Sequence, residues 1–154
     1  MAQVEERLKE LGLELPAVPE PIANYVGAVW TGNLVFLSGR GPRRDGRFVS
    51  TGKLGRGVTV EEGYEAARLT ALNLLATLKS EVGNLDRVRR IVKLVGMVSC
   101  DPSFTEHPQV VNGASDLLVA VFGDRGRHAR SAFGVASIPM DASVEIELIV
   151  EVEP

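Results

Sequence analysis

The chain has one cysteine and few histidines, and this scarcity limits its chemistry. Cys100 is the single thiol among 154 residues, so neither an internal disulfide nor a zinc site of several cysteines can form. Because Cys100 ends an apolar run, we expect a small packed side chain there. The two histidines, His107 and His128, give little material for a paired-histidine mechanism.

Long hydrophobic runs are also missing. No stretch approaches 18 consecutive apolar residues, so we expect no membrane span. The opening residues, MAQVEERLKELGLELP, are charged and lack the apolar core of an ordinary secretory signal. Together with the single cysteine, these absences predict a protein of the reducing cytoplasm.

No large excess of one charge is present. Lysine and arginine number 17 and aspartate and glutamate 20, a net charge of −3, which argues against a dedicated nucleic-acid binder because phosphate contacts need basic excess. The arginine-rich stretches GPRRDGR and GDRGRHAR are exceptions that we interpret as solvated loops. The hydrophobic share of 45% is typical of a globular protein, and the length suits one domain.

The pattern of residues 1–22 indicates an N-terminal extension to the main domain. Val4, Leu8 and Leu11 or Leu13 recur near helical spacing, which predicts a short amphipathic helix before Pro16. Prolines at 16, 19 and 21 then predict an extended connector that cannot continue the helix. We therefore divide the chain into a helix and connector over residues 1–22 and a main domain over residues 23–154.

The order of elements in the main domain predicts an α+β fold. A capping box at Thr59 and Glu62 marks a helix start, and the next helix is expected over His107–Phe122. The expected strands are Tyr25–Trp30 and Leu34–Ser38 as a hairpin, a short Arg47–Ser50, Val88–Ser99, Ser131–Ile138 and Ser143–Val152. This order allows one mixed sheet of about five to six strands with both helices on one face.

A glycine-rich stretch between residues 39 and 57 invites a phosphate-loop interpretation. A phosphate loop needs Gly-Lys-Ser/Thr leading directly into a helix, and Gly52-Lys53-Leu54 lacks the hydroxyl. We reject that interpretation and expect a surface loop.

The C-terminal segment contains the most specific pattern. Arg130 opens the apolar run SAFGVASI, where burying an unpaired guanidinium would be costly, so its charge must reach water, a carboxylate or a bound anion. RSAFGVASIPMDASVEIELIV resembles the C-terminal signature of the YjgF/YER057c/UK114 family, also called the Rid family of enamine/imine deaminases. Three earlier segments also match motifs of the family in the same order: NYVGAV, FLSGR and LDRVRRIVKLVGMVSCDPSF.

The resemblance implies both a fold and an activity. It implies a Bacillus chorismate mutase-like fold, a homotrimer, and hydrolysis of 2-enamino or 2-imino acids to 2-keto acids and ammonia in a cleft between subunits, with no metal and no cofactor. Arg130 would bind the substrate carboxylate, and Glu145 would position the attacking water. The other implied substrate-binding residues are Tyr25, Ser38, Gly39, Arg40, Phe104 and Asn112.

Geometry adds a constraint on this site. If the last two strands formed a simple hairpin, Arg130 and Glu145 would lie about 16 Å apart, because a strand rises about 3.3 Å per residue. A shared site would then need another strand order or a neighbouring chain. Three departures from the family pattern mark a divergent branch: Ala23-Asn24 before Tyr25, Arg40 in place of Gln, and Ala132 in place of Cys.

Other functions stay open at this point. A non-catalytic trimeric protein that binds a small carboxylate is one alternative. Ribonuclease or translation-inhibitor activity, a label often attached to the family as endoribonuclease L-PSP, is another, although the acidic balance opposes it. Chorismate mutase chemistry rests on fold analogy alone.

Overall fold

One five-stranded sheet, in the order β1-β2-β9-β7-β8, forms the centre of the fold. The computed structural model describes residues 3–18 and 24–154. The sheet strands are β1 (Ala28–Thr31), β2 (Leu34–Arg40), β7 (Val88–Ser99), β8 (Ala129–Val135) and β9 (Val144–Val152). Neighbouring strands are antiparallel except β7 and β8, which are parallel. The predicted mixed sheet is confirmed.

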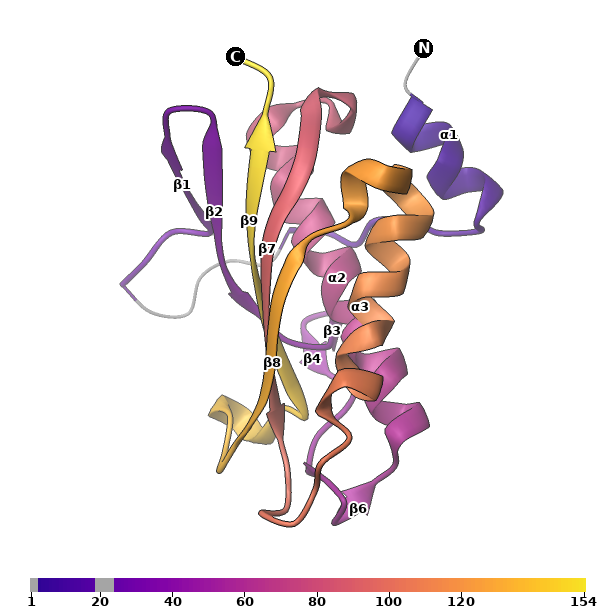
Figure 1. The fold of residues 1–154 in the computed structure, drawn as a ribbon, viewed down its shortest axis with the longest axis vertical. Coiled ribbons are helices and arrows are strands. Elements are labelled where there is room, and N and C mark those ends of the chain that lie inside the picture. Colours follow the sequence, from indigo (N-terminus) through magenta and orange to yellow (C-terminus); the bar gives the residue numbers. More distant parts are fainter. Residues whose placement is uncertain (1–2, 19–23) are drawn as a thin grey trace.

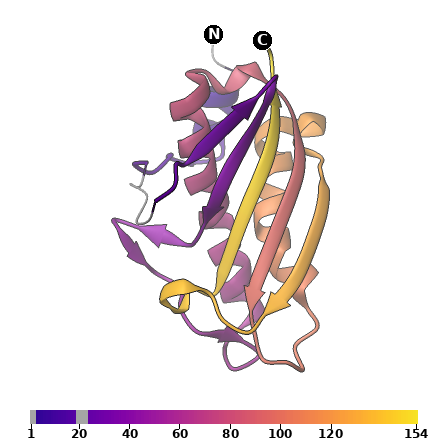
Figure 2. The same cartoon turned by 90° about the vertical axis from the view of Figure 1, so that its left-hand side faces the viewer.

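Two long helices, α2 (Val60–Val82) and α3 (His107–Phe122), cover one face of this sheet, as Figures 1 and 2 show. α2 begins at the predicted capping box: the Glu62 amide donates to Thr59 Oγ1 at 3.1 Å, and the Thr59 amide donates to the Glu62 carboxylate at 3.0 Å. α3 forms the crossover that a parallel β7–β8 pair requires. The α+β architecture with both helices on one face is therefore confirmed.

Strand β9 shows how the sequence separates the two faces. Its even-numbered residues, from Val144 to Val152, are buried against the helices, and the residues between them are at least partly exposed. Side chains alternate along a strand, so Glu145 lies on the opposite, open face. Phe36 and Phe133 lie on the same open face through their pairing register and are 40% and 44% exposed. A single chain thus leaves apolar side chains uncovered.

The predicted N-terminal helix is α1 (Gln3–Glu10), and it packs into the main core through buried Val4 and Leu8. Its first amides, of Gln3 and Val4, donate to the Asp86 carboxylate at 2.9 and 2.8 Å. Asp86 belongs to the short 3₁₀ helix η1 (Leu85–Arg87). Pro19, Pro21 and the predicted boundary at residues 22–23 lie outside the described residues.

The structure shifts some predicted strand bounds. β8 begins at Ala129, two residues before the expected start, because its parallel pairing with β7 extends back to Lys93. Arg130 is therefore a residue of the strand instead of the residue just before it. β7 lies between β8 and β9, so the last two strands are not a hairpin.

The stretch between β2 and α2 holds two small paired sheets, β3 (Arg43–Arg44) with β4 (Arg47–Phe48) and β5 (Lys53–Leu54) with β6 (Gly57–Val58). The remaining 3₁₀ helices are η2 (Gly123–Gly126) and η3 (Pro139–Asp141). No helix in the described ranges is long and apolar enough to cross a membrane.

Candidate functional site

Arg130 lies on the edge strand β8, with its side chain directed under α3. Its register partner on β7 is Leu94, which is fully buried on the helix side. Arg130 Nη1 donates to Asn112 Oδ1 at 2.8 Å and to Ser115 Oγ at 3.2 Å. Asn112 and Ser115 are three residues apart and so share one face of α3. The structure thus brings together two predicted site residues, Arg130 and Asn112.

These contacts occupy only one end of the guanidinium. Both hydrogens of Nη1 are directed to α3, whereas Nε and Nη2 make no hydrogen bond within residues 3–18 and 24–154. Nor does any carboxylate of these ranges form an ion pair with Arg130. The Nε–Nη2 edge is the geometry that binds a carboxylate through two parallel hydrogen bonds. An anion is therefore the chemical complement of this side chain.

Glu145 occupies a different setting, on the open face of the sheet beside β2. The side chain lies against Gly39, where an added Cβ would come within 2.7 Å of Glu145 Oε2. A larger residue at position 39 would therefore displace this carboxyl from its present position. Partial burial, and secondarily the charge of Glu147, raise the pKa of Glu145. A raised pKa makes a carboxyl better suited to exchange protons near neutral pH.

Ser38 lies in β2 and is bonded to the segment before β1, which carries Tyr25. The Ser38 hydroxyl donates to the Val26 carbonyl at 2.6 Å, and its amide donates to the Gly27 carbonyl at 2.9 Å. These bonds hold the segment that carries Tyr25, whose side chain is 42% exposed. Gly39 and Glu145 consequently lie together, with Ser38 next to Gly39 on β2, and a substrate-binding role for Tyr25 stays a prediction.

Arg40 does not lie on this face. It pairs with the buried Ile146, so its side chain is directed toward α2. A Cβ at Gly27 would come within 2.9 Å of Arg40 Nη2 and 3.4 Å of Thr77 Cγ2, which places the guanidinium between β1 and α2. Burial lowers the pKa of Arg40. A substrate-binding role for Arg40 stays a prediction.

Phe104 lines a separate cavity of about 390 Å³ together with Cys100 and His107. The Phe104 ring meets the His107 ring edge-on at 5.2 Å between centroids. Cys100 is buried, and its Sγ lies 3.5 Å from His107 Nε2. Burial raises the pKa of the Cys100 thiol, which disfavours a reactive thiolate.

Arg130 and Glu145 cannot share a small ligand within one chain. Arg130 is in register with Leu94, and Glu145 with Met97, on the strand between them. Two strand spacings of about 4.8 Å and three residues of about 3.3 Å separate the two Cα atoms by about 14 Å. The side chains also lie on opposite faces. The strand order therefore leaves a neighbouring chain as the way to combine them.

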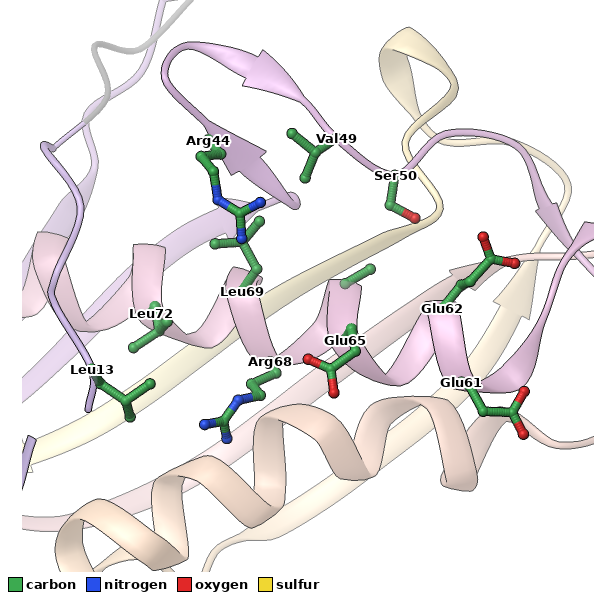
Figure 3. A pocket seen from close by; sticks show the side chains of 11 residues that line it. Leu13, Arg44, Val49, Ser50, Glu61, Glu62, Glu65, Arg68, Leu69 and Leu72 are labelled. Atoms are coloured by element: carbon green, nitrogen blue, oxygen red, sulfur yellow. The ribbon is translucent and has the colours of Figure 1, made fainter. Parts of the chain in front are cut away.

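A larger cavity of about 550 Å³ lies on the outer side of α2, beneath the β3–β4 hairpin (Figure 3). Its floor is apolar, from Leu13, Leu69 and Leu72, and Arg44 and Glu65 stand at its rim. None of the predicted site residues lines it. Within the described ranges, no group of three or more histidine, cysteine or acidic side chains is arranged to hold a metal ion.

Sequence reasoning missed two residues beside Arg130. Ser115 Oγ accepts from Arg130 and lies 2.9 Å from His128 Nε2, while His128 Nδ1 lies 2.6 Å from the Gly126 carbonyl. Burial lowers the pKa of His128; the hydrogen bond to the Gly126 carbonyl opposes this effect, and the charge of Arg130 adds to it. The available signal was the spacing of Ser115 from Asn112 on one helix face.

The fold and the matched residues define the class of protein. The model of the YjgF/chorismate mutase-like endoribonuclease family matches residues 5–152, so the chain belongs to this family. Protein TCP17 of Trypanosoma cruzi is 47% identical over 150 residues, covering 97% of this chain and 94% of that protein. A 2-iminobutanoate/2-iminopropanoate deaminase of Dermatophagoides farinae is 28% identical over 141 residues, covering 92% and 95%.

A solved structure shares the whole arrangement. The protein Atu1372 of Agrobacterium tumefaciens superposes with a TM-score of 0.92 at 47% identity, covering 98% of this chain and 93% of that one. The match extends through α1, because it includes nearly the full length.

Proposed function

We propose that this protein hydrolyses 2-enamino or 2-imino acids to 2-keto acids and ammonia in a cleft formed between copies of the chain. The observation that carries the proposal is that Arg130 Nη1 is held by Asn112 and Ser115 while its Nε–Nη2 edge makes no hydrogen bond to the described residues. This edge would bind the substrate carboxylate and present the imine carbon at a fixed distance. The deaminase relative supports the substrate class.

Glu145 of a neighbouring copy would supply the proton transfer. Its carboxylate would take one proton from water as the oxygen bonds to the imine carbon, and would give it to the nitrogen to form a carbinolamine. It would then move the hydroxyl proton to the nitrogen as the C–N bond breaks, the keto C=O forms and ammonia leaves. The raised pKa of Glu145 supports this exchange. The open sheet face, with exposed Phe36 and Phe133, supports association of copies, and the family resemblance makes a trimer the expected state.

The test is release of 2-keto acid from imines generated in place by an amino acid oxidase. We expect the protein to speed this release and Arg130→Ala to lower kcat/KM by at least about a hundredfold, since a bidentate pair to a charged group is lost. Arg127→Ala is the matched control, because Arg127 is exposed on the same segment and its ion pair among the described residues is with Asp124. Equal rates for the wild type and Arg130→Ala would contradict the proposal. Tight keto acid binding without any rate effect would favour the non-catalytic carboxylate-binding protein instead.

A second candidate function, RNA binding or cleavage, is favoured by one observation. A cavity of about 310 Å³ is lined by Arg89, Arg90, Arg125 and Arg127 with Asp124, a local excess of positive charge in an acidic chain. Binding through phosphates would weaken steeply with salt. An affinity for single-stranded RNA that is independent of salt, or undetectable at low salt, would remove this candidate.

A further inference from the structure

The hydrogen bonds behind Arg130 form a directed chain. A backbone carbonyl can only accept, so the 2.6 Å contact from His128 Nδ1 to the Gly126 carbonyl requires a proton on Nδ1. In a neutral imidazole, Nε2 is then the acceptor. The Ser115 hydroxyl, 2.9 Å away, donates to Nε2 and turns its lone pairs toward Arg130 Nη1 at 3.2 Å.

The electrostatic setting keeps His128 neutral. Burial lowers its pKa, and the nearby Arg130 charge acts in the same direction. Among the described residues, the hydrogen-bond partners of its two ring nitrogens are both uncharged: the Ser115 hydroxyl on α3 and the Gly126 carbonyl on η2. A neutral ring with one fixed tautomer gives the Ser115 hydroxyl a single orientation.

We infer that His128 and Ser115 are positioning residues, which hold the Arg130 guanidinium in the plane that presents its Nε–Nη2 edge to a carboxylate. This inference rests on the proposed carboxylate-binding role of Arg130. The guanidinium is on a flexible side chain, and fixing it before binding saves the entropy of ordering it when the ligand arrives. Asn112 fixes one hydrogen of Nη1, and the Ser115–His128 pair fixes the other.

The chain of hydrogen bonds from the Gly126 carbonyl through His128 and Ser115 to Arg130, called the relay below, makes a distinct prediction for mutants. Ser115→Ala and His128→Leu should each weaken binding of 2-oxobutanoate about tenfold, because one hydrogen bond to a charged group is lost or left unoriented. KM should rise by a similar factor while kcat stays within about twofold, since neither residue touches the reacting atoms. His128→Gln keeps an acceptor that Ser115 can reach and should recover most of the affinity.

Two measurements separate failure of the relay from failure of the proposed function. Calorimetric titration of 2-oxobutanoate into Arg130→Ala tests the carboxylate site itself, and undiminished affinity there would overturn both ideas. Loss of binding in Arg130→Ala with affinity within twofold of wild type in Ser115→Ala and His128→Leu would overturn the relay alone. Nitrogen NMR of the His128 ring in the unmutated protein adds a test that needs no variant to fold. An Nδ1–H tautomer supports the relay, and an Nε2–H or doubly protonated ring at neutral pH contradicts it.

Discussion

Arg130 and Glu145 lie on opposite faces of the same sheet, and their surroundings differ in kind. Arg130 is surrounded by neutral hydrogen-bonding groups of α3 that direct the cation and leave one edge available. Glu145 lies against Gly39 with Glu147 nearby, and its partial burial, followed by the charge of Glu147, makes its charged form less stable and raises its pKa. The first region leaves a guanidinium edge that would suit an anion, and the second raises the pKa of a carboxyl. Neither region is a complete site for imine hydrolysis.

The largest expected effect concerns how the two regions combine. Arg130→Ala and Glu145→Gln should each inactivate the protein, and co-refolding the two variants at equal amounts should restore activity. If each cleft takes its arginine from one copy and its glutamate from the next, random assembly recreates about a quarter of the intact clefts.

The measurement is the deaminase rate before and after co-refolding, with co-refolded Arg130→Ala and Arg130→Lys as the control mixture. A mixture of Arg130→Ala and Glu145→Gln that stays as inactive as its components would show that the two residues do not meet between copies. Sedimentation analysis confirms that mixed oligomers have formed.

A smaller effect is expected at Gly39. Gly39→Ala would place a Cβ 2.7 Å from Glu145 Oε2 and push the carboxyl aside. Displacement of a catalytic group by about 1 Å can cost up to about a hundredfold in rate, so we expect kcat to fall between tenfold and about a hundredfold.

The control is the same substitution in the Glu145→Gln background. Two changes that act through one group are not additive, so Gly39→Ala should cost almost nothing further there. An equal loss in both backgrounds would mean that Gly39 acts by shaping the strand, and thermal melting of each variant would show how far.

The smallest effect is on stability. The folded-state pKa of Glu145 is raised, so the folded protein binds more protons than the unfolded chain between the ordinary carboxyl pKa and the raised value. Wild-type stability should therefore fall as pH increases through that window. Glu145→Gln removes this loss and should raise the melting temperature at neutral pH by at most about 3 °C, with no gain below the ordinary carboxyl pKa.

Melting curves across acidic to neutral pH, with the exposed Glu153→Gln as the control, check this. A gain of the same size at every pH would mean that ionisation of Glu145 is not its cause.

Local patterns predicted much of the fold. Val88–Ser99 and His107–Phe122 were predicted to the residue, since a run of β-branched side chains and a helical stripe are both encoded locally. The capping box at Thr59 fixed the start of α2 in the same way. The place of β7 between β8 and β9 could not be read from either strand, because pairing depends on contacts distant in the chain.

The candidate site was only partly accessible to sequence reasoning. Arg130 and Asn112 came from the family resemblance, and the structure places them in contact. The spacing of Ser115 from Asn112 is a weak signal, because polar pairs on one helix face are common on any surface, and His128 has no periodic signal at all. Arg40 occupies the position of a family glutamine next to Gly39, yet the irregularity in β2 between Leu37 and Arg40 interrupts the alternation and turns its side chain to the helix side, away from Glu145.

Under the proposed function, the location of Arg130 on β8, the last strand of the sheet, would couple assembly to ligand binding. An outer strand presents unpaired backbone groups that favour association with another chain. A second chain that associated along the β8 edge would lie close to the Arg130 guanidinium. Mass action then links the two equilibria: ligand would oppose dissociation of the oligomer, and dilution below the dissociation constant of the oligomer would reduce turnover per chain. Catalytic capacity would in this way depend on cellular concentration as well as on the chemistry of the side chains.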